Sequence, residues 1–234
     1  MVELCLIWGI LFPLLGTVVG AALVFCLNWD SGRLRRMFSG AAAGIMGAAS
    51  VFGLFLPALA QSFWALIGAA LGVGFLMIPG SLMGRRGSHG WLVALAVVLH
   101  NIPEGMATGV SFGSWLTGSG VFAADALAVG VGIGLQNLPD GAMVALPLRQ
   151  QGMGRGKAFA FGVLSGLVEP AAAVCMLAWA GNMGVFLPFL MGFAAGAMGY
   201  VVVGELVPGM GLREGKVSGT VCFVLGLAGM LLIV

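Results

Sequence analysis

The sequence has very little charge. Only 8% of its 234 residues are Asp, Glu, Lys or Arg, whereas a typical soluble domain carries about 25%. Tyr occurs once, His twice and Cys four times, while 60% of the residues are hydrophobic. This composition excludes a separate soluble domain, a nucleic-acid-binding surface and a disordered tail. It indicates a polytopic membrane protein.

The few cysteines give no sign of a disulfide or a thiolate metal site. They lie singly in apolar stretches and form no Cys-x-x-Cys pair. We therefore interpret all four as small packing residues. The N-terminal stretch has Glu3 where a signal peptide would carry Lys or Arg, so it is predicted to be a retained first span.

Long apolar runs, separated by short polar or Gly/Pro-rich breaks, predict an all-α polytopic membrane protein. A membrane-spanning helix needs roughly 20 apolar residues, and runs of this length accommodate eight transmembrane helices in a single transporter domain, residues 1–234. The predicted spans are 4–27, 37–58, 62–82, 91–112, 120–147, 157–180, 184–207 and 216–234.

The basic residues mark one side of the predicted bundle. All 10 of them lie in or at the breaks that follow spans 1, 3, 5 and 7. Those residues are Arg33, Arg35, Arg36, Arg85, Arg86, Arg149, Arg155, Lys157, Arg213 and Lys216. Since basic loops face the cytoplasm, the pattern predicts outward-facing N- and C-termini.

Acidic residues, in contrast, occur inside the predicted spans. Glu104, Asp140, Glu169 and Glu205 have no Lys or Arg beside them there. A buried carboxylate is costly unless it is paired, protonated or bound to a metal. These residues therefore imply either bound protons or an exogenous cation. Asp125, near the outer end of span 5, is either a charge that collects ions or a solvated helix end.

A short motif occurs twice, in spans that cross in opposite directions. His100–Gly105 reads HNIPEG and Gln136–Gly141 reads QNLPDG. Such a pair predicts an inverted repeat in which helices 4 and 5 form a midplane site. Ser165–Pro170, SGLVEP, adds a third acid beside a proline in span 6. Imidazole, carboxylate and amide donors together suit Zn²⁺, Fe²⁺, Mn²⁺ or Co²⁺.

These three segments resemble the metal-site motifs of the ZIP (Zrt-/Irt-like) family of divalent-metal transporters. The resemblance implies a binuclear metal centre between spans 4, 5 and 6. The first-site positions would be His100, Glu104, Gln136 and Asp140. The second-site positions would be Asn101, Asn137 and Glu169, with Glu104 and Asp140 shared. It further implies that Met46 contacts the first site and that Glu205 lies on the inward path. A homodimer and an elevator-like motion are also implied.

The sequence departs from the family pattern in three places. Asp140 stands where Glu is usual, and Gln136 and Asn137 replace the His or acid of some members. The basic loop 83–90 is short and carries only His89, which we interpret as solvated. The resemblance is to bacterial members, which implies a multi-pass protein of the bacterial plasma (inner) membrane.

The resulting hypothesis is an importer of a divalent transition metal, zinc first, with iron, manganese and cadmium as further candidates. It would work by alternating access, as a transporter and not an enzyme, with no cofactor. The alternatives are a proton- or sodium-coupled carrier and a metal-selective channel. An intramembrane metallopeptidase would need a motif such as His-Glu-x-x-His, which the sequence lacks. A purely structural scaffold would leave the unpaired acids unexplained.

Overall fold

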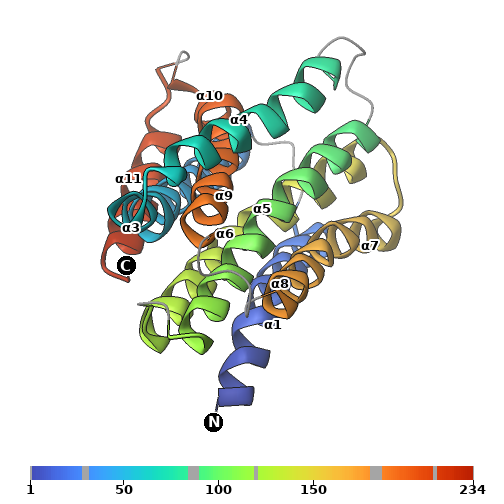
Figure 1. Cartoon of the computed structure of the whole chain (residues 1–234). Coiled ribbons are helices and arrows are strands. Elements are labelled where there is room, and N and C mark those ends of the chain that lie inside the picture. Colours follow the sequence, from blue (N-terminus) through green and yellow to red (C-terminus); the bar gives the residue numbers. More distant parts are fainter. Residues whose placement is uncertain are drawn as a thin grey trace.

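A computed structural model of the chain describes residues 2–27, 32–83, 90–118, 121–179, 186–212 and 215–233, without the side chains of residues 78–100. It is nearly all helical, and no strand occurs in these ranges (Figure 1). The helical elements are α1 (Val2–Ala22), η1 (Leu23–Phe25), α2 (Gly32–Ala48), η2 (Ala49–Phe55), α3 (Leu56–Gln61), α4 (Trp64–Met83), α5 (Gly90–Leu116), α6 (Ala123–Gln150), α7 (Arg155–Gly166), α8 (Val168–Ala178), α9 (Leu187–Val201), η4 (Val202–Leu206), α10 (Val207–Gly209) and α11 (Val217–Leu231).

Within the described ranges these elements join end to end into eight helical rods, in the order of the predicted spans. The second rod contains the π-helical segment η2, and the seventh contains the π-helical segment η4. Several rods run past the apolar stretches: α2 begins at Gly32, α5 continues to Leu116 and α6 to Gln150. At the start of α2 and the end of α6, long basic side chains can reach water from the terminal turn. The predicted boundaries at 120, 180, 184 and 234 lie outside the described residues.

Four helical stretches of the described chain are long and apolar enough to cross a membrane. They are Val2–Phe25, Gly32–Gln61, Arg155–Ala178 and Leu187–Gly209. Trp64–Met77 and Val217–Leu231 are apolar but shorter. α6 has the length but carries the polar QNLPDG motif in its middle, which lowers its mean hydropathy. The chain is therefore a multi-pass membrane protein in which the long helix α6, like α5, carries a polar motif among its apolar residues.

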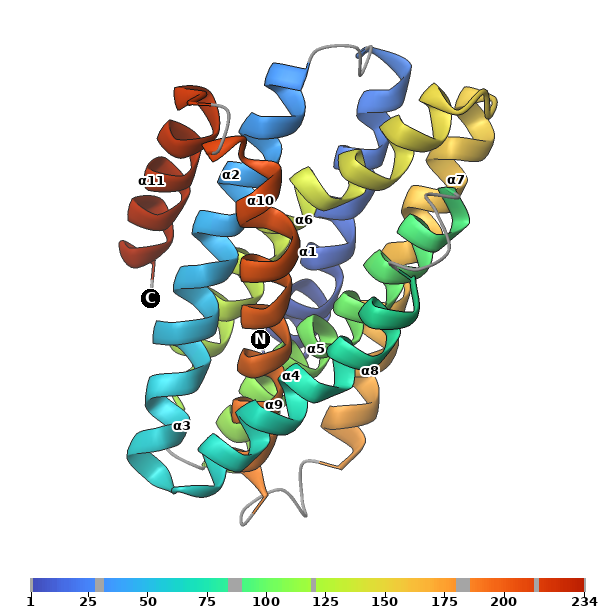
Figure 2. The ribbon, with the colours of Figure 1, turned by 90° about the horizontal axis from the view of Figure 1, so that it is seen from above.

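The rods associate in close pairs: α1 with α6, α2 with α11, α4 with α9, and α5 with α8. In Figure 2, α11 lies beside α2 at one side of the bundle, and α5 lies with α8 at the other. Small residues allow this approach. A Cβ on Gly105 of α5 would overlap the backbone of Glu169 in α8, and one on Gly16 of α1 would overlap the carbonyl of Gly134 in α6.

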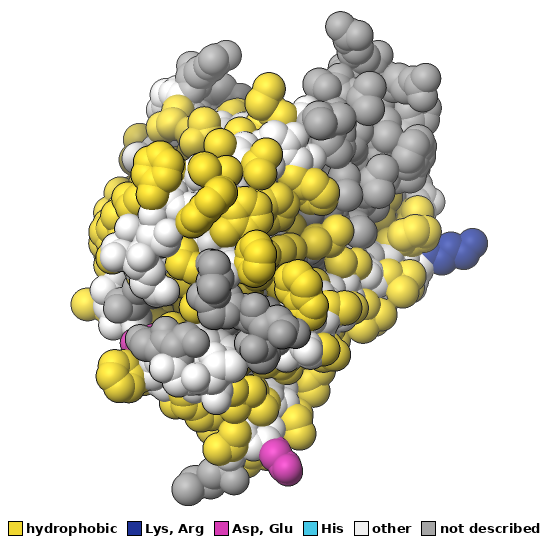
Figure 3. Space-filling model, viewed as in Figure 1, with side chains coloured by type: hydrophobic (Ala, Val, Ile, Leu, Met, Phe, Trp, Pro, Cys, Tyr) yellow, Lys and Arg dark blue, Asp and Glu magenta, His cyan; other side chains and the backbone are white. Residues whose placement is uncertain are grey.

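Buried apolar side chains form two clusters. The larger one draws on α2, α5, α6 and α9 and includes Met46 and Met198. The smaller one joins the end of α1 to α6 and α7 and includes Val24 and Leu146. The outer surface is also apolar: yellow side chains cover most of the face seen in Figure 3. Phe63, for example, is 70% exposed. Such a surface is suited to lipid contact.

Candidate metal centre

The repeated motif lies on two neighbouring long helices, α5 and α6. Pro103 and Pro139 each stand inside a helix that continues on both sides. Within the motif, Asn101, Glu104 and Gln136 are fully buried, at 0–1% exposure. His100 lies on α5, and its side chain is among those not described.

The first contact joins the two copies of the motif. Gln136 donates from Nε2 to Oε1 of Glu104 over 2.8 Å. Both side chains are fully buried, so this bond is shielded from water. The structure therefore brings together two of the four residues that the resemblance assigns to the first site.

The second contact brings in the sixth rod. Asn137 donates from Nδ2 to Oε2 of Glu169, in the first turn of α8. On the opposite copy of the motif, Asn101 donates from Nδ2 to the carbonyl of Ser165 over 2.8 Å. The rod is interrupted at Leu167, between α7 and α8. Pro170, which lacks an N–H, explains a break one turn earlier. This break lies where the rod meets both copies of the motif.

The sequence did not indicate that α1 also contributes. The amide of Asn137 donates a second bond to the carbonyl of Pro13 over 3.0 Å. The hydroxyl of Thr17 lies 3.5 Å from Oε1 of Glu169 and 3.4 Å from that same carbonyl. The available signal was weak: Thr17 is a polar residue in a very apolar first span. With α1 included, four rods surround the polar centre.

The polar side chains of the centre leave several oxygens without a protein hydrogen-bond donor. Within the described part of the chain, these buried atoms are Asn101 Oδ1, Glu104 Oε2, Gln136 Oε1, Asn137 Oδ1, Asp140 Oδ1 and Asp140 Oδ2. All of them are acceptors, and none is a donor. A set of buried acceptors is completed by a cation or by a proton, since either provides positive charge.

The described titratable side chains of the centre are all acidic. Glu104 interacts electrostatically with Asp140 and Glu169, and among the described side chains no Lys or Arg pairs with these acids. Among the described side chains, no three from His, Cys, Asp and Glu lie close enough together to hold one metal ion by themselves. The amide oxygens and His100 would therefore be needed to complete a metal-binding set.

Comparison with known proteins identifies the family. The model of the family described as ZIP Zinc transporter matches residues 77–234. The chain belongs to the ZIP family. Its first spans, before residue 77, lie outside that match, although α1 contributes to the polar centre.

Several relatives in this ZIP family are similar over different lengths. The zinc transporter ZIPB of Bordetella bronchiseptica is 33% identical over 240 residues, covering 92% of this chain and 75% of ZIPB. Zinc transporter ZIP11 of Xenopus tropicalis is 39% identical over 154 residues, covering 63% of this chain and 46% of ZIP11. Zinc transporter GufA of Myxococcus xanthus is 38% identical over 125 residues, covering 53% of this chain and 47% of GufA. The alignment thus spans less than half of ZIP11 and of GufA.

The remaining candidate residues of this ZIP chain lie in different surroundings. Met46 is buried on α2 in the larger apolar cluster. Asp125 accepts a hydrogen bond from the backbone N–H of Phe122 over 3.0 Å, a helix-capping contact that favours the structural alternative for it. Glu205 is exposed in the π-helical segment η4 and interacts electrostatically with Asp140. Of these three residues, only Glu205 has a described interaction with an acid of the polar centre.

Proposed function

We propose that this protein imports a divalent transition metal, in the first place zinc, into the cytoplasm through the polar centre between α1, α5, α6 and α8. The observation that carries the proposal is the group of three buried carboxylates, Glu104, Asp140 and Glu169, without a basic partner among the described side chains. A metal cation would neutralise this charge and occupy the unpaired oxygens. ZIPB, ZIP11 and GufA are each zinc transporters by name, which supports zinc.

Two amide–carboxylate pairs support a binuclear arrangement. Gln136 holds one oxygen of Glu104, and Asn137 holds one oxygen of Glu169. Asp140 has both oxygens unpaired, so it is suited to bridge two ions. His100 would add a nitrogen ligand to the oxygen ligands of the site, and imidazole nitrogen is a common ligand of zinc. We assign His100, Glu104, Gln136, Asp140 and, from α2, Met46 to the first site.

The second site of this proposal uses Asn101, Asn137 and Glu169, with Glu104 and Asp140 shared. The amide oxygens of both asparagines have no described hydrogen-bond donor, which supports their use as ligands. From Asp140 the ion would move inward past Glu205, whose charge acts on Asp140. Asp125 would lie at the outer end of the route.

The proposed orientation of the chain in the membrane rests on the basic residues. We propose that the ends with Arg33, Arg149 and Lys216 are cytoplasmic and that both termini face outward, in a bacterial plasma membrane. Eight transmembrane helices, a homodimer and alternating access belong to the same proposal. Protonation of the carboxylates on metal release would lower the cost of an empty site.

The direct test is metal uptake by the purified full chain in proteoliposomes that enclose a metal-sensitive dye. We expect saturable uptake of Zn²⁺ and little uptake of Mg²⁺, which requires octahedral oxygen ligands and dehydrates reluctantly. Protein-free liposomes provide the control. A rate that rises linearly with zinc, without saturation, would favour a channel. Folded protein that transports none of zinc, iron, manganese or cadmium would overturn the proposal.

The contact from α1 leads to a second, smaller prediction. Thr17→Val keeps the shape of the side chain but removes the hydroxyl near Glu169. A hydrogen bond contributes about 1 kcal/mol, so we expect the half-saturating zinc concentration to rise a few-fold with little change in maximal rate. Thr17→Ser, which retains the hydroxyl, should resemble the wild type. An unchanged half-saturation in Thr17→Val would show that the hydroxyl does not support Glu169.

A further inference from the structure

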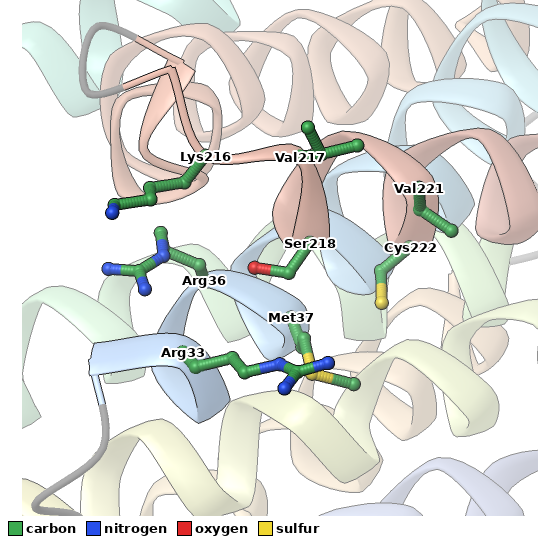
Figure 4. A pocket seen from close by; sticks show the side chains of 8 residues that line it. All are labelled: Arg33, Arg36, Met37, Lys216, Val217, Ser218, Val221 and Cys222. Atoms are coloured by element: carbon green, nitrogen blue, oxygen red, sulfur yellow. The ribbon is translucent and has the colours of Figure 1, made fainter.

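A cavity opens between α2 and α11, and none of its described lining residues belongs to the proposed metal route. Its volume is about 490 Å³, and Figure 4 shows the side chains that line it. Further along the two helices, the backbones of α2 and α11 lie in close contact. A Cβ on Gly40 would overlap the carbonyl of Gly219, and a Cβ on Gly44 would overlap the carbonyl of Phe223. The walls of the cavity are therefore held by a closely packed helix pair.

One part of the lining is cationic. Arg33 and Arg36 come from the start of α2, and Lys216 directly precedes α11. Among the described residues that line the cavity, none is acidic. In Figure 4, Lys216 and Arg36 extend toward the same side, and the hydroxyl of Ser218 lies on the wall between the two helices. Arg33 and Lys216 are exposed, so basic side chains from both helices attract an anion to this opening.

The rest of the lining is apolar and continues onto the outer surface. Met37, Val217 and Val221 form it, together with Cys222. Val217 is 68% exposed and Val221 is 49% exposed. Further along α11, Leu225 is also exposed. A ligand with an anionic end and a long apolar end would therefore match both parts of the cavity.

We propose that this cavity binds an anionic phospholipid, with its phosphate among Arg33, Arg36 and Lys216 and an acyl chain along Val217 and Val221. Free phosphate shares the chemistry of the headgroup, but it would leave the apolar wall uncovered. Basic pockets between membrane helices on the cytoplasmic side are suited to anionic headgroups, because that leaflet is negatively charged. The bound lipid would contact both helices and stabilise the α2–α11 pair.

The test compares two double variants of the full chain that each lose two positive charges from exposed positions. Arg33→Gln with Lys216→Gln changes the cavity, whereas Arg155→Gln with Lys157→Gln changes the start of α7, which does not line it. Arg36 is left intact because it is only partly exposed. Lipid bound to the detergent-purified protein is measured by native mass spectrometry and by the rise in thermal unfolding temperature on addition of lipid.

We expect phosphatidylglycerol to bind and stabilise the wild type more than phosphatidylcholine does. A basic residue near a membrane surface is worth about 1 kcal/mol toward anionic lipid, so the cavity variant should bind phosphatidylglycerol about 30-fold more weakly. The α7 variant should bind it as the wild type does. Inorganic phosphate at millimolar concentration should displace little of the lipid.

Three outcomes would overturn the proposal. Equal phosphatidylglycerol binding in the cavity variant and the wild type would show that the lipid binds elsewhere. Equal losses of phosphatidylglycerol binding in the two double variants would show that binding depends on total charge and not on this cavity. Full displacement by inorganic phosphate would assign the cavity to a free anion. If the double cavity variant does not fold, Lys216→Gln alone, at an exposed position, carries the same comparison.

Discussion

Glu104→Ala should abolish zinc uptake. Glu104 is completely buried, accepts the amide of Gln136 with one oxygen and has no protein donor at the other. Loss of a residue that only supports a metal ligand costs about 10–100-fold, so removal of a shared ligand should lower the initial uptake rate at least about 100-fold. The measurement is zinc entry into proteoliposomes that contain equal amounts of folded protein.

Two controls separate the charge of Glu104 from its shape. Glu104→Gln keeps the size of the side chain and an oxygen that can accept from Gln136, but removes the negative charge, so it should also transport poorly. Glu3→Ala removes an exposed carboxylate from the first turn of α1 and should transport as the wild type does. If Glu104→Ala transports zinc at the rate of Glu3→Ala, the polar centre is not the metal site.

Gly105→Ala should destabilise the contact between α5 and α8. A Cβ at this position would lie 2.8 Å from the Cβ of Ala172 and would overlap the carbonyl of Glu169. Backbone cannot move aside as a flexible side chain can, and overpacking of this kind costs about 1–3 kcal/mol. We expect a lower thermal unfolding temperature in detergent. Because the displaced backbone carries Glu169, zinc uptake should fall as well.

Gly74→Ala on α4 provides the matched control. Nothing lies within 4 Å of a Cβ at Gly74, so the same added methyl group meets no neighbour. Alanine favours a helix over glycine by about 1 kcal/mol, and the unfolding temperature of this variant should be unchanged or slightly higher. Equal destabilisation by the two substitutions would argue against close contact between α5 and α8.

The sequence predicted the order and approximate limits of the helices because apolar length and composition determine them. It also predicted that the two copies of the motif would meet. The hydrogen bond between Gln136 and Glu104 fits that prediction, which placed both residues at similar depths on helices of opposite direction. Their role as metal ligands stays a prediction, as does that of His100, whose side chain lies outside the described ones.

The sequence could not predict the contacts from α1. The bond of Asn137 to the carbonyl of Pro13 and the contact of Thr17 with Glu169 depend on how distant helices pack, and a backbone carbonyl has no signature in a sequence. The family match, which begins at residue 77, does not include α1 either. The π-helical segments η2 and η4 were missed for a related reason: an apolar run has the same composition in an α-helix and a π-helix.

The place of α1 in the centre has a consequence for biogenesis. Thr17 is synthesised and inserted long before its partner Glu169, which follows 152 residues later. The hydroxyl of Thr17 and the carbonyl of Pro13 therefore belong to a helix that is inserted in the bilayer before the sixth rod has been synthesised. Until then the hydroxyl lacks its contact with Glu169. We expect the centre to assemble only at that late stage of translation. Nascent chains halted before Glu169 would contain both copies of the motif without their closing helix.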